Sequence, residues 1–385
     1  MVPGNAGMAR AGVACTPTLD AAGAVDLVVI GPEQPLVDGL ADRLRSNGVP
    51  VFGPGADGAG LEGSKVHLKQ VLQRAGVPTA ASRAFRTGEE VAAETFLGSL
   101  AGPWVVKTDG LAAGKGVLVA DDLADAVADV KDKLSGASFG AAGRTIVIEE
   151  GLSGAEVSVL AICDGRTTDD AVVVLPVARD HKRVGDGDIG PNTGGMGAFS
   201  PVCGVPPDLA DLVLETMVLP TLHTLAADGV DYRGVLYAGI MLTPDGPKLL
   251  EYNVRFGDPE AQVVLPRLDG DLAALLASAA AGRVDPTAVT VRPEACVGVV
   301  LAAPGYPAAP VTGGVIEGLE GAGPLVFCAG VAERDGRLVT AGGRVVCVAA
   351  LGADGPAARR AAYAAADQVS FEGGVLRRAD IAATA

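Results

Sequence analysis

The sequence predicts a mixed α/β and α+β protein built from three consecutive parts. Short apolar runs at Val25–Ile30 and Val49–Phe52 flank a helical pattern at Leu36–Asn47, which is the strand–helix–strand order of an open α/β sheet. The first run is expected to be a buried parallel strand. Strands and helices then alternate, and strands with Gly-rich turns dominate toward the C-terminus. The expected parts are an N-terminal α/β unit, a central α+β region in two pieces and a C-terminal, mostly β unit.

The central region begins with a helix at Ser64–Ala75, where Ser64 is suited to cap the N-terminus and Gly76 to end the helix. Strands at Trp104–Lys107 and Val117–Ala120 flank a Gly-rich loop, and this short separation favours a hairpin over a crossover. Further expected helices and strands are helices at 123–134, 207–228 and 356–368, and strands at 145–150, 156–163, 171–177, 234–242, 247–252, 295–303, 326–332 and 338–349.

Charge and composition limit the function classes. The chain has 46 acidic and 30 basic residues and a net charge of -16, so we expect no nucleic-acid partner. No apolar run approaches the length of a membrane span, and the N-terminus lacks a basic-then-apolar signal pattern. The six cysteines are scattered without metal-binding spacing, as expected of free thiols in a reducing compartment. We therefore expect a cytoplasmic protein without a membrane partner.

The segment Lys107–Gly116, KTDGLAAGKG, could bind phosphate. A Gly-rich loop brings backbone N–H groups close to phosphate oxygens, and a lysine adds positive charge. Neither this segment nor Gly58–Lys65 has the GxxxxGK[ST] spacing of a P-loop, which makes a P-loop NTPase an unfavoured interpretation. On this segment alone, an ordinary hairpin turn is an equally good interpretation.

Two glutamates follow the apolar residues Thr145–Ile148 of the predicted strand. The sequence Glu149-Glu150-Gly151-Leu152, with Glu156 shortly after it, could present a carbonyl, an N–H group and a carboxylate to a purine and its ribose. Taken alone, such a pair of glutamates is more often a solvated strand end.

The segment 249–260, LLEYNVRFGDPE, concentrates polar groups on one strand face. Glu251 and Asn253 stand two residues apart, so their side chains point the same way. A carboxylate and an amide oxygen suit Mg²⁺ that also contacts phosphates. Arg255 continues this face and could clamp an acyl phosphate or a carboxylate. A merely polar strand face is the less favoured interpretation.

A basic cluster at Asp180–Arg183 precedes a Gly-rich segment at Gly190–Gly197, GPNTGGMG. Such a pairing suits a small anionic substrate. The alternative is a long surface turn.

Together these motifs resemble the ATP-grasp superfamily and, within it, the phosphoribosylamine–glycine ligases, also called glycinamide ribonucleotide synthetases. The resemblance covers nearly the whole chain in family order. The matching segments are PGNAG (3–7), GPEQPL (31–36), LEGSK (61–65), KTDGLAAGKGV (107–117), IEEGLSGAE (148–156), DHKRVGDGDIGPNTGGMGAFSP (180–201), GVLYAGIML (234–242), EYNVRFGDPE (251–260) and TAGGRVVCV (340–348).

The resemblance implies a Rossmann-like N-terminal domain at 1–63, an ATP-grasp domain at 64–293 with a lid at about 84–154, and a small β-rich C-terminal domain at 294–385. It also implies that ATP phosphorylates the glycine carboxylate and that phosphoribosylamine attacks the resulting glycyl phosphate. ATP and Mg²⁺ (or Mn²⁺) are the implied cofactors, the two small molecules are the implied partners, and a monomer is favoured.

Roles for individual residues follow from the same resemblance. For ATP, it implies phosphate contacts from Lys65 and Lys107, a lid segment at Gly114, Lys115 and Gly116, an adenine site at Glu149, Glu150 and Leu152, and a ribose contact from Glu156. For the metal and the reaction, it implies Glu251 and Asn253 as ligands, with Arg255 and Lys115 acting on the transferred phosphoryl group. For the amino-acid substrate, it implies Asp180, Lys182, Asn192, Thr193, Gly194 and Gly195.

The sequence departs from the family at its start. The family places a strand, a GGREHA-like loop and a helix before PGNAG, and here this unit is absent and the stretch after PGNAG is short, so a truncated Rossmann-like domain is expected. A misassigned start and a genuinely truncated copy both explain this. The family also has a glycine where many ATP-grasp enzymes carry a second metal carboxylate, and that position here is Gly239. Two alternatives remain open, another ATP-grasp ligase of the biotin-carboxylase type and an inactive nucleotide-binding remnant.

Overall fold

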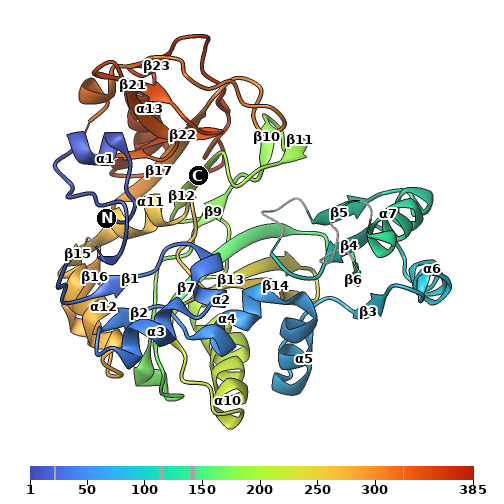
Figure 1. Ribbon diagram of the computed structural model, residues 1–385. Coiled ribbons are helices and arrows are strands. Elements are labelled where there is room, and N and C mark those ends of the chain that lie inside the picture. The colour runs from blue at the N-terminus through green and yellow to red at the C-terminus, as the bar shows by residue number, and fades with distance from the viewer. Residues whose placement is uncertain (21–22, 112–115, 137, 139–143, 324) are drawn as a thin grey trace.

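The computed structural model describes residues 1–385 except 21–22, 112–115, 137, 139–143 and 324. Three bodies are visible in Figure 1: a lower region with most of the helices, a lid subdomain that projects to the right, and an upper region that contains the C-terminus. The cavity described below lies where these bodies meet.

The N-terminal part contains one small parallel sheet, in which β1 (Val28–Val29) pairs with β2 (Val51–Phe52). The prediction of a buried first strand was wrong, because β1 has one strand neighbour among the described residues and Val29 is 44% exposed. The single helix expected at 36–47 is two helices, α2 (Glu33–Val37) and α3 (Leu40–Ser46). Gly39 separates them with φ 74°, a left-handed conformation that interrupts a helix.

Two short helices complete this part, and neither was predicted. Helix α1 (Ala6–Arg10) packs on the C-terminal region, where the Asn5 amide donates to the Cys328 carbonyl at 2.7 Å. Helix α4 (Ala56–Gly63) leads directly into the central region and carries Glu62 toward the cavity.

The central antiparallel sheet has the order β14-β13-β7-β8. Its strands are β7 (Ala155–Asp164), β8 (Val172–Val174), β13 (Arg233–Thr243) and β14 (Gly246–Asn253). Alternate residues of β7 enter different cores, as strand geometry requires. Val159 packs in the core that includes α5 (Lys65–Ala75), whereas Leu160 packs in the core that includes α12 (Leu272–Ala280).

Helices cover the first of these cores. The helical pattern predicted at 207–228 is confirmed as α9 (Leu209–Val213), one π-helical turn (Leu214–Val218) and α10 (Leu219–Ala227). This run is long and apolar enough to cross a membrane by length and composition. Its buried side chains, such as Val213 and Leu222, are part of the protein core instead.

The lid subdomain has its own four-stranded antiparallel sheet, in the order β3-β6-β4-β5. Its strands are β3 (Ser82–Arg86), β4 (Trp104–Thr108), β5 (Val117–Ala120) and β6 (Thr145–Glu150). Helices α6 (Glu90–Ser99) and α7 (Leu123–Ser135) pack on it around a separate core that contains Phe85, Val106 and Ile148. The predicted β4–β5 hairpin is confirmed.

The upper region contains a five-stranded sheet in the order β19-β22-β17-β12-β9. Its strands are β9 (Arg179–Asp180), β12 (Gly197–Ser200), β17 (Ala295–Ala302), β19 (Val326–Cys328) and β22 (Arg344–Gly352), and α13 (Gly355–Ala366) packs against it. Strands β9 and β12 come from the central region of the sequence. The two ends of the segment that was predicted as a basic cluster and loop therefore belong to the same sheet as the C-terminal strands, and β10 (Arg183–Gly185) and β11 (Ile189–Asn192) form a separate pair between them.

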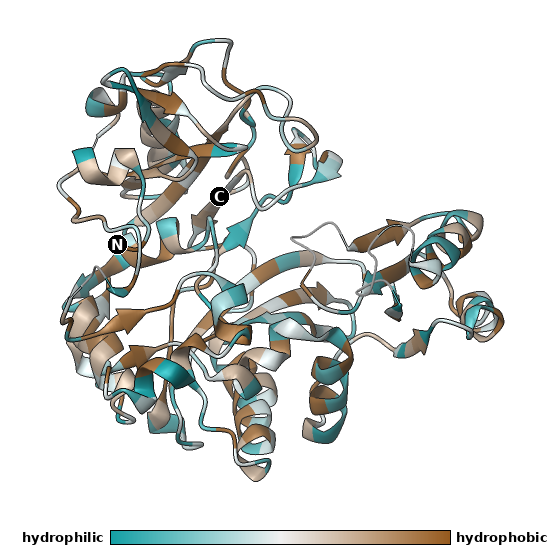
Figure 2. Ribbon diagram, in the orientation of Figure 1, coloured by the Kyte–Doolittle hydropathy of each residue, from teal (hydrophilic) through white to brown (hydrophobic). Residues whose placement is uncertain are grey.

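Four small strand pairs and one further short helix complete the described strands and α-helices. They comprise β10 (Arg183–Gly185) with β11 (Ile189–Asn192), β15 (Leu268–Gly270) with β16 (Val289–Val291), β18 (Ile316–Glu317) with β23 (Ser370–Phe371), β20 (Val331–Arg334) with β21 (Arg337–Thr340), and the short helix α11 (Ala261–Val264). The strands expected at 326–332 and 338–349 are thus each divided in two. Figure 2 shows hydrophobic residues along the strands of the sheets.

Candidate active site

A cavity of about 1000 Å³ opens between the lid, the central sheet and the C-terminal region. The structure brings most of the predicted site residues to its wall. These are Lys65, Lys107, Gly116, Glu149, Glu150, Leu152, Glu156, Asp180, Lys182, Asn192, Thr193, Gly194, Glu251, Asn253 and Arg255. Gly195 is not among the described lining residues, and Gly114 and Lys115 lie outside the residues that the structure describes.

Lys65 stands in the first turn of α5, and local sequence explains its position. Ser64 caps this helix by accepting from the backbone N–H of His67 at 3.1 Å, and its hydroxyl donates to Asp109 at 3.0 Å. The Lys65 ammonium donates to the Gly110 carbonyl at 3.0 Å. The helix start is thereby attached to the beginning of the Gly-rich loop. Burial lowers the pKa of Lys65, which Glu251 partly offsets.

Lys107 lies on β4 and is 7% exposed. Its ammonium is 3.1 Å from a carboxylate oxygen of Glu149, and it also donates to the Leu250 carbonyl at 3.4 Å. Burial alone would lower the pKa of Lys107, but Glu149 and Glu251 raise it above its ordinary value. Lys107 is therefore held as a cation at the cavity wall.

Glu149 also contacts a lysine that the sequence analysis missed. The Lys69 ammonium lies 3.2 Å from the other Glu149 oxygen and donates to the Thr79 hydroxyl at 2.9 Å. Burial lowers the pKa of Lys69. Lys69 follows Lys65 by one helical turn, and this spacing was a signal that could have placed both on one face of α5. The Glu149 side chain is thus a counter-ion for two lysines.

The segment after β6 is held by the strands beside it. The Glu150 carboxylate accepts from the backbone N–H of Ala81 at 3.0 Å and lies 3.4 Å from the Lys248 ammonium. The Gly151 N–H donates to the Pro103 carbonyl at 2.8 Å. These bonds hold the backbone at Glu150 and Gly151, and so position the next residue, Leu152, at the cavity wall.

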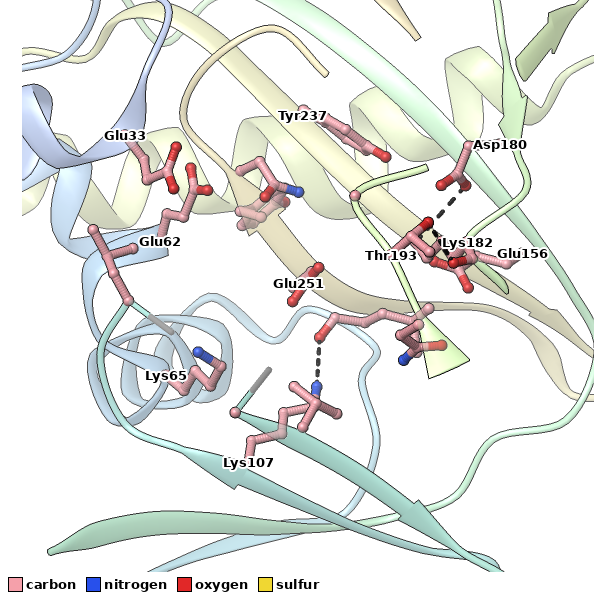
Figure 3. Close-up of a pocket in the computed structure, with 18 of the residues that line it drawn as sticks. Glu33, Glu62, Lys65, Lys107, Glu156, Asp180, Lys182, Thr193, Tyr237 and Glu251 are labelled. Atoms are coloured by element: carbon pink, nitrogen blue, oxygen red, sulfur yellow. Dashed lines mark hydrogen bonds and ion pairs between the residues drawn. The ribbon is translucent and has the colours of Figure 1, made fainter. Parts of the chain in front are cut away.

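Glu251 occupies the centre of the cavity, between the lysines and the more distant polar cluster (Figure 3). Burial alone would raise the pKa of Glu251, but Lys107, Lys182 and Lys65 lower it below its ordinary value. The carboxylate is therefore ionised. Gly239 faces Glu251 across the β13–β14 ladder, so no second side chain competes for the space opposite.

Arg255 is held by two glutamates that the sequence analysis did not assign. Its guanidinium donates to Glu62 at 2.9 Å, to the amide oxygen of Asn253 at 3.2 Å, and lies 3.5 Å from Glu33. Burial alone would lower the pKa of Arg255, but Glu62 and Glu33 raise it. Glu62 also accepts from the backbone N–H of Val254 at 2.8 Å, which joins α4 to the end of β14.

A second polar cluster lies at the far side of Glu251 (Figure 3). Lys182 pairs with Glu156, and its ammonium is 3.8 Å from Asp180. Burial raises the pKa of Asp180 to about 7, against the opposing effect of Lys182. Burial would lower the pKa of Lys182, but Asp180 and Glu156 raise it well above its ordinary value.

Tyr237 and its partners Glu260 and Ser158, next to this cluster, were not predicted as site residues. The Tyr237 hydroxyl donates to Glu260 at 2.7 Å and lies 2.8 Å from the Ser158 hydroxyl. Thr193 joins the cluster through its backbone N–H and its hydroxyl, which both donate to the Lys182 carbonyl at 2.8 Å.

The cavity thus has two chemically different ends around one central carboxylate. At one end, buried lysines suit a polyphosphate, with oxygen ligands beside them for a divalent cation. At the other end, a carboxylate and an ammonium group stand close enough to bind a small zwitterion. This arrangement can hold a nucleoside triphosphate and bring its terminal phosphate toward a second substrate.

Known protein families match this chain over nearly its whole length. Models of phosphoribosylglycinamide synthetase match its N domain at residues 1–62, its ATP-grasp (A) domain at 63–261 and its C domain at 296–384. The phosphoribosylamine–glycine ligase of Caulobacter vibrioides is 49% identical, over 97% of this chain and 90% of that protein. The Pseudomonas aeruginosa ligase of the same name is 45% identical, over 98% of this chain and 90% of that protein.

Solved structures resemble this chain over most of its length. The crystal structure of the phosphoribosylamine–glycine ligase of Thermotoga maritima matches with a TM-score of 0.87 and 39% identity, over 99% of this chain and 93% of that one. A biotin carboxylase domain of Hydrogenobacter thermophilus, solved with MgADP and bicarbonate, matches with a TM-score of 0.70 and 16% identity, over 93% of this chain and 76% of that one. The second likeness concerns the fold alone. The predicted fold class and family resemblance are confirmed.

Proposed function

This chain belongs to the phosphoribosylglycinamide synthetase family, and from this premise we propose that it joins glycine to 5-phosphoribosylamine at the expense of ATP. The products are glycinamide ribonucleotide, ADP and phosphate, in purine biosynthesis. The observation that carries the proposal is the central position of Glu251, between a lysine-lined end of the cavity and the end that contains Asp180 and Lys182. The cytoplasmic location and monomeric state expected from the sequence remain predictions.

The residues around Glu251 fit a divalent cation. Glu251 is kept ionised by its lysine neighbours, and Asn253 adds an amide oxygen two residues along the same strand. Among the described residues, no group of three or more His, Cys, Asp or Glu side chains converges on one point. Such a sparse oxygen set suits Mg²⁺ or Mn²⁺ that takes its remaining ligands from phosphates and water. When bound, the cation neutralises phosphate charge.

In the proposed reaction, a carboxylate oxygen of glycine attacks the γ-phosphorus of ATP and ADP leaves. The amine of phosphoribosylamine then attacks the carbonyl carbon of glycyl phosphate, phosphate leaves with the oxygen that joined it to carbon, and the amine loses a proton. Lys65 and Lys107 bind the phosphates of ATP. Arg255, oriented by Glu62, stabilises the transferred phosphoryl group, so catalysis consists mainly of positioning and charge neutralisation.

We assign the ammonium group of glycine to Asp180. This carboxylate is buried beside Lys182 and Thr193 at the end of the cavity opposite the lysines that bind ATP. Glu150 and Leu152 border the adenine at the edge of the lid. Glu156, which lies on β7 and pairs with Lys182, borders the ribose on the side that faces the glycine site. Glu149 supports the ATP-binding end by holding Lys107 and Lys69.

Binding of glycine should depend on pH through Asp180. Because burial raises the pKa of Asp180 to about 7, the group is neutral in acid and loses its attraction for an ammonium group there. We expect kcat/KM for glycine, measured at saturating ATP and Mg²⁺, to rise with pH, to reach half its maximum near pH 7, and to level off above it.

The matched control is Asp180→Asn, which keeps the shape and removes the titration. We expect this variant to have a low and flat profile between pH 6 and 8. A profile with the same inflection as the unaltered protein would remove Asp180 from the glycine site.

Substrate omission tests the proposed function. ADP release from ATP and Mg²⁺ is measured with glycine and freshly generated phosphoribosylamine, and each substrate is left out in turn. We expect sustained release only with both. Release that requires bicarbonate and not glycine would favour a biotin-carboxylase-type ligase, and no release under any condition would favour a nucleotide-binding remnant.

A further inference from the structure

The segment TAGGRVVCV (340–348) has no role in the mechanism above, yet its arginine reaches the cavity. Arg344 begins β22 at the rim, with its side chain 22% exposed. One terminal nitrogen donates to the Gly194 carbonyl at 2.6 Å and to the Asp258 carbonyl at 2.9 Å. The other terminal nitrogen donates to the Asp258 carboxylate at 3.0 Å. One side chain therefore connects three segments that are far apart in the sequence.

Gly194 is bound on both sides by residues of the C-terminal region. Its carbonyl accepts from Arg344, and its N–H donates to the Tyr306 hydroxyl at 3.2 Å. Gly343 leaves room for that tyrosine, since a Cβ there would lie 2.2 Å from the ring. A Cβ at Gly194 would itself lie 2.8 Å from the Arg344 guanidinium. The contact thus depends on both glycines.

The next glycine, Gly195, packs against Pro259, in the chain that follows the proposed metal ligand Asn253. Gly195 has φ 107°, and a Cβ there would lie 2.3 Å from Pro259. The loop Thr193–Gly195 is therefore enclosed between the C-terminal region and the chain that follows Asn253. Asp258 lies in the same stretch of chain, so its ion pair with Arg344 joins that stretch to the C-terminal region.

We propose that Arg344 is a positioning residue of this ligase, which rests on the function proposed above. It fixes the loop Thr193–Gly195 relative to the segment Asn253–Asp258, and so sets the distance between the glycine site and the metal site. A planar guanidinium can donate to two carbonyls and a carboxylate at once, whereas a lysine ammonium lacks this fork. The bonds that fix Lys65 and Lys107 do not involve Arg344, so ATP binding should be spared.

Steady-state kinetics of Arg344→Met and Arg344→Lys test this proposal. We expect kcat/KM for glycine to fall at least about tenfold in both variants, since small displacements of reacting groups are costly. Arg344→Lys should lose about as much as Arg344→Met, because the loop requires the guanidinium fork and not only the charge. KM for ATP should stay within about twofold of the unaltered value, because Lys65 and Lys107 are held by contacts that do not involve Arg344. Asp258→Asn, at a side chain that is 51% exposed, should cause a smaller loss in the same direction. The control is Arg337→Met, which removes an exposed pair with Glu317 in the same region and should change neither constant.

Hydrogen exchange of the peptide that covers residues 190–198 gives a readout without turnover. Arg344→Met and Asp258→Asn should accelerate exchange there, and Arg337→Met should not. If the unaltered protein makes no product, the proposed function fails while exchange still decides the role of Arg344. Unchanged exchange, or equal losses of efficiency with ATP and with glycine, would overturn the positioning role.

Discussion

Replacing Glu251 by glutamine is expected to abolish ATP turnover while the fold is retained. Glutamine preserves the size of the side chain but removes the charge on which Lys107, Lys182 and Lys65 converge. Loss of a metal ligand that supports phosphoryl transfer should cost about 4 kcal/mol of transition-state stabilisation, or roughly a 1000-fold fall in kcat. ADP release under saturating substrates measures this.

The matched control for Glu251 is Asp245→Asn, in the turn of the same β13–β14 hairpin. Asp245 is exposed and lies outside the cavity lining, so this variant should keep full activity. Circular dichroism and melting temperature should show that both variants fold. A Glu251→Gln protein with unaltered turnover would remove Glu251 from the site.

The second large effect is expected from replacing Lys107, which should mainly weaken the binding of ATP. Lys107→Met removes a buried cation but leaves Glu149 paired with Lys69, so the lid core should persist. A charge-assisted hydrogen bond to phosphate contributes roughly 1.5–3 kcal/mol, so KM for ATP should rise about 10- to 100-fold. KM for glycine should change little.

Initial rates at varied ATP measure this effect, with Lys131→Met as the control. Lys131 is an exposed lysine of the same lid subdomain, paired with Glu94 on its surface, and its loss should leave the ATP dependence as it is. An unaltered ATP dependence in Lys107→Met would place Lys107 outside the phosphate site.

Local signals in the sequence were sufficient for several elements. Helix α5 was predicted to within one residue of its observed bounds, because its N-cap at Ser64 and its left-handed Gly76 both act within one turn of the helix. The β4–β5 hairpin was predicted for the same reason, since its two strands are close in sequence. The shared orientation of Glu251 and Asn253 follows from the two-residue period of a strand.

Contacts between distant segments could not be predicted in this way. Arg255 and Glu62 are 193 positions apart and meet only because α4 packs against β14. The segment Asp180–Arg183 was interpreted as a basic cluster beside a loop, yet Asp180 pairs with β12 in a sheet that the C-terminal part completes. The break in the helix predicted at 36–47 depends on the conformation of one glycine, whereas the periodicity of the apolar residues continues across it.

The central claim is that the cavity passes the γ-phosphoryl group of ATP to the carboxylate of glycine, and isotope transfer tests it most directly. Glycine labelled with ¹⁸O in both carboxylate oxygens is incubated with the protein, ATP, Mg²⁺ and phosphoribosylamine, and the inorganic phosphate is analysed by mass spectrometry. Because phosphate leaves with an oxygen that came from glycine, each phosphate formed should carry one ¹⁸O. Unlabelled phosphate, formed together with product, would contradict the acyl phosphate route and the roles assigned here to Glu251 and Arg255.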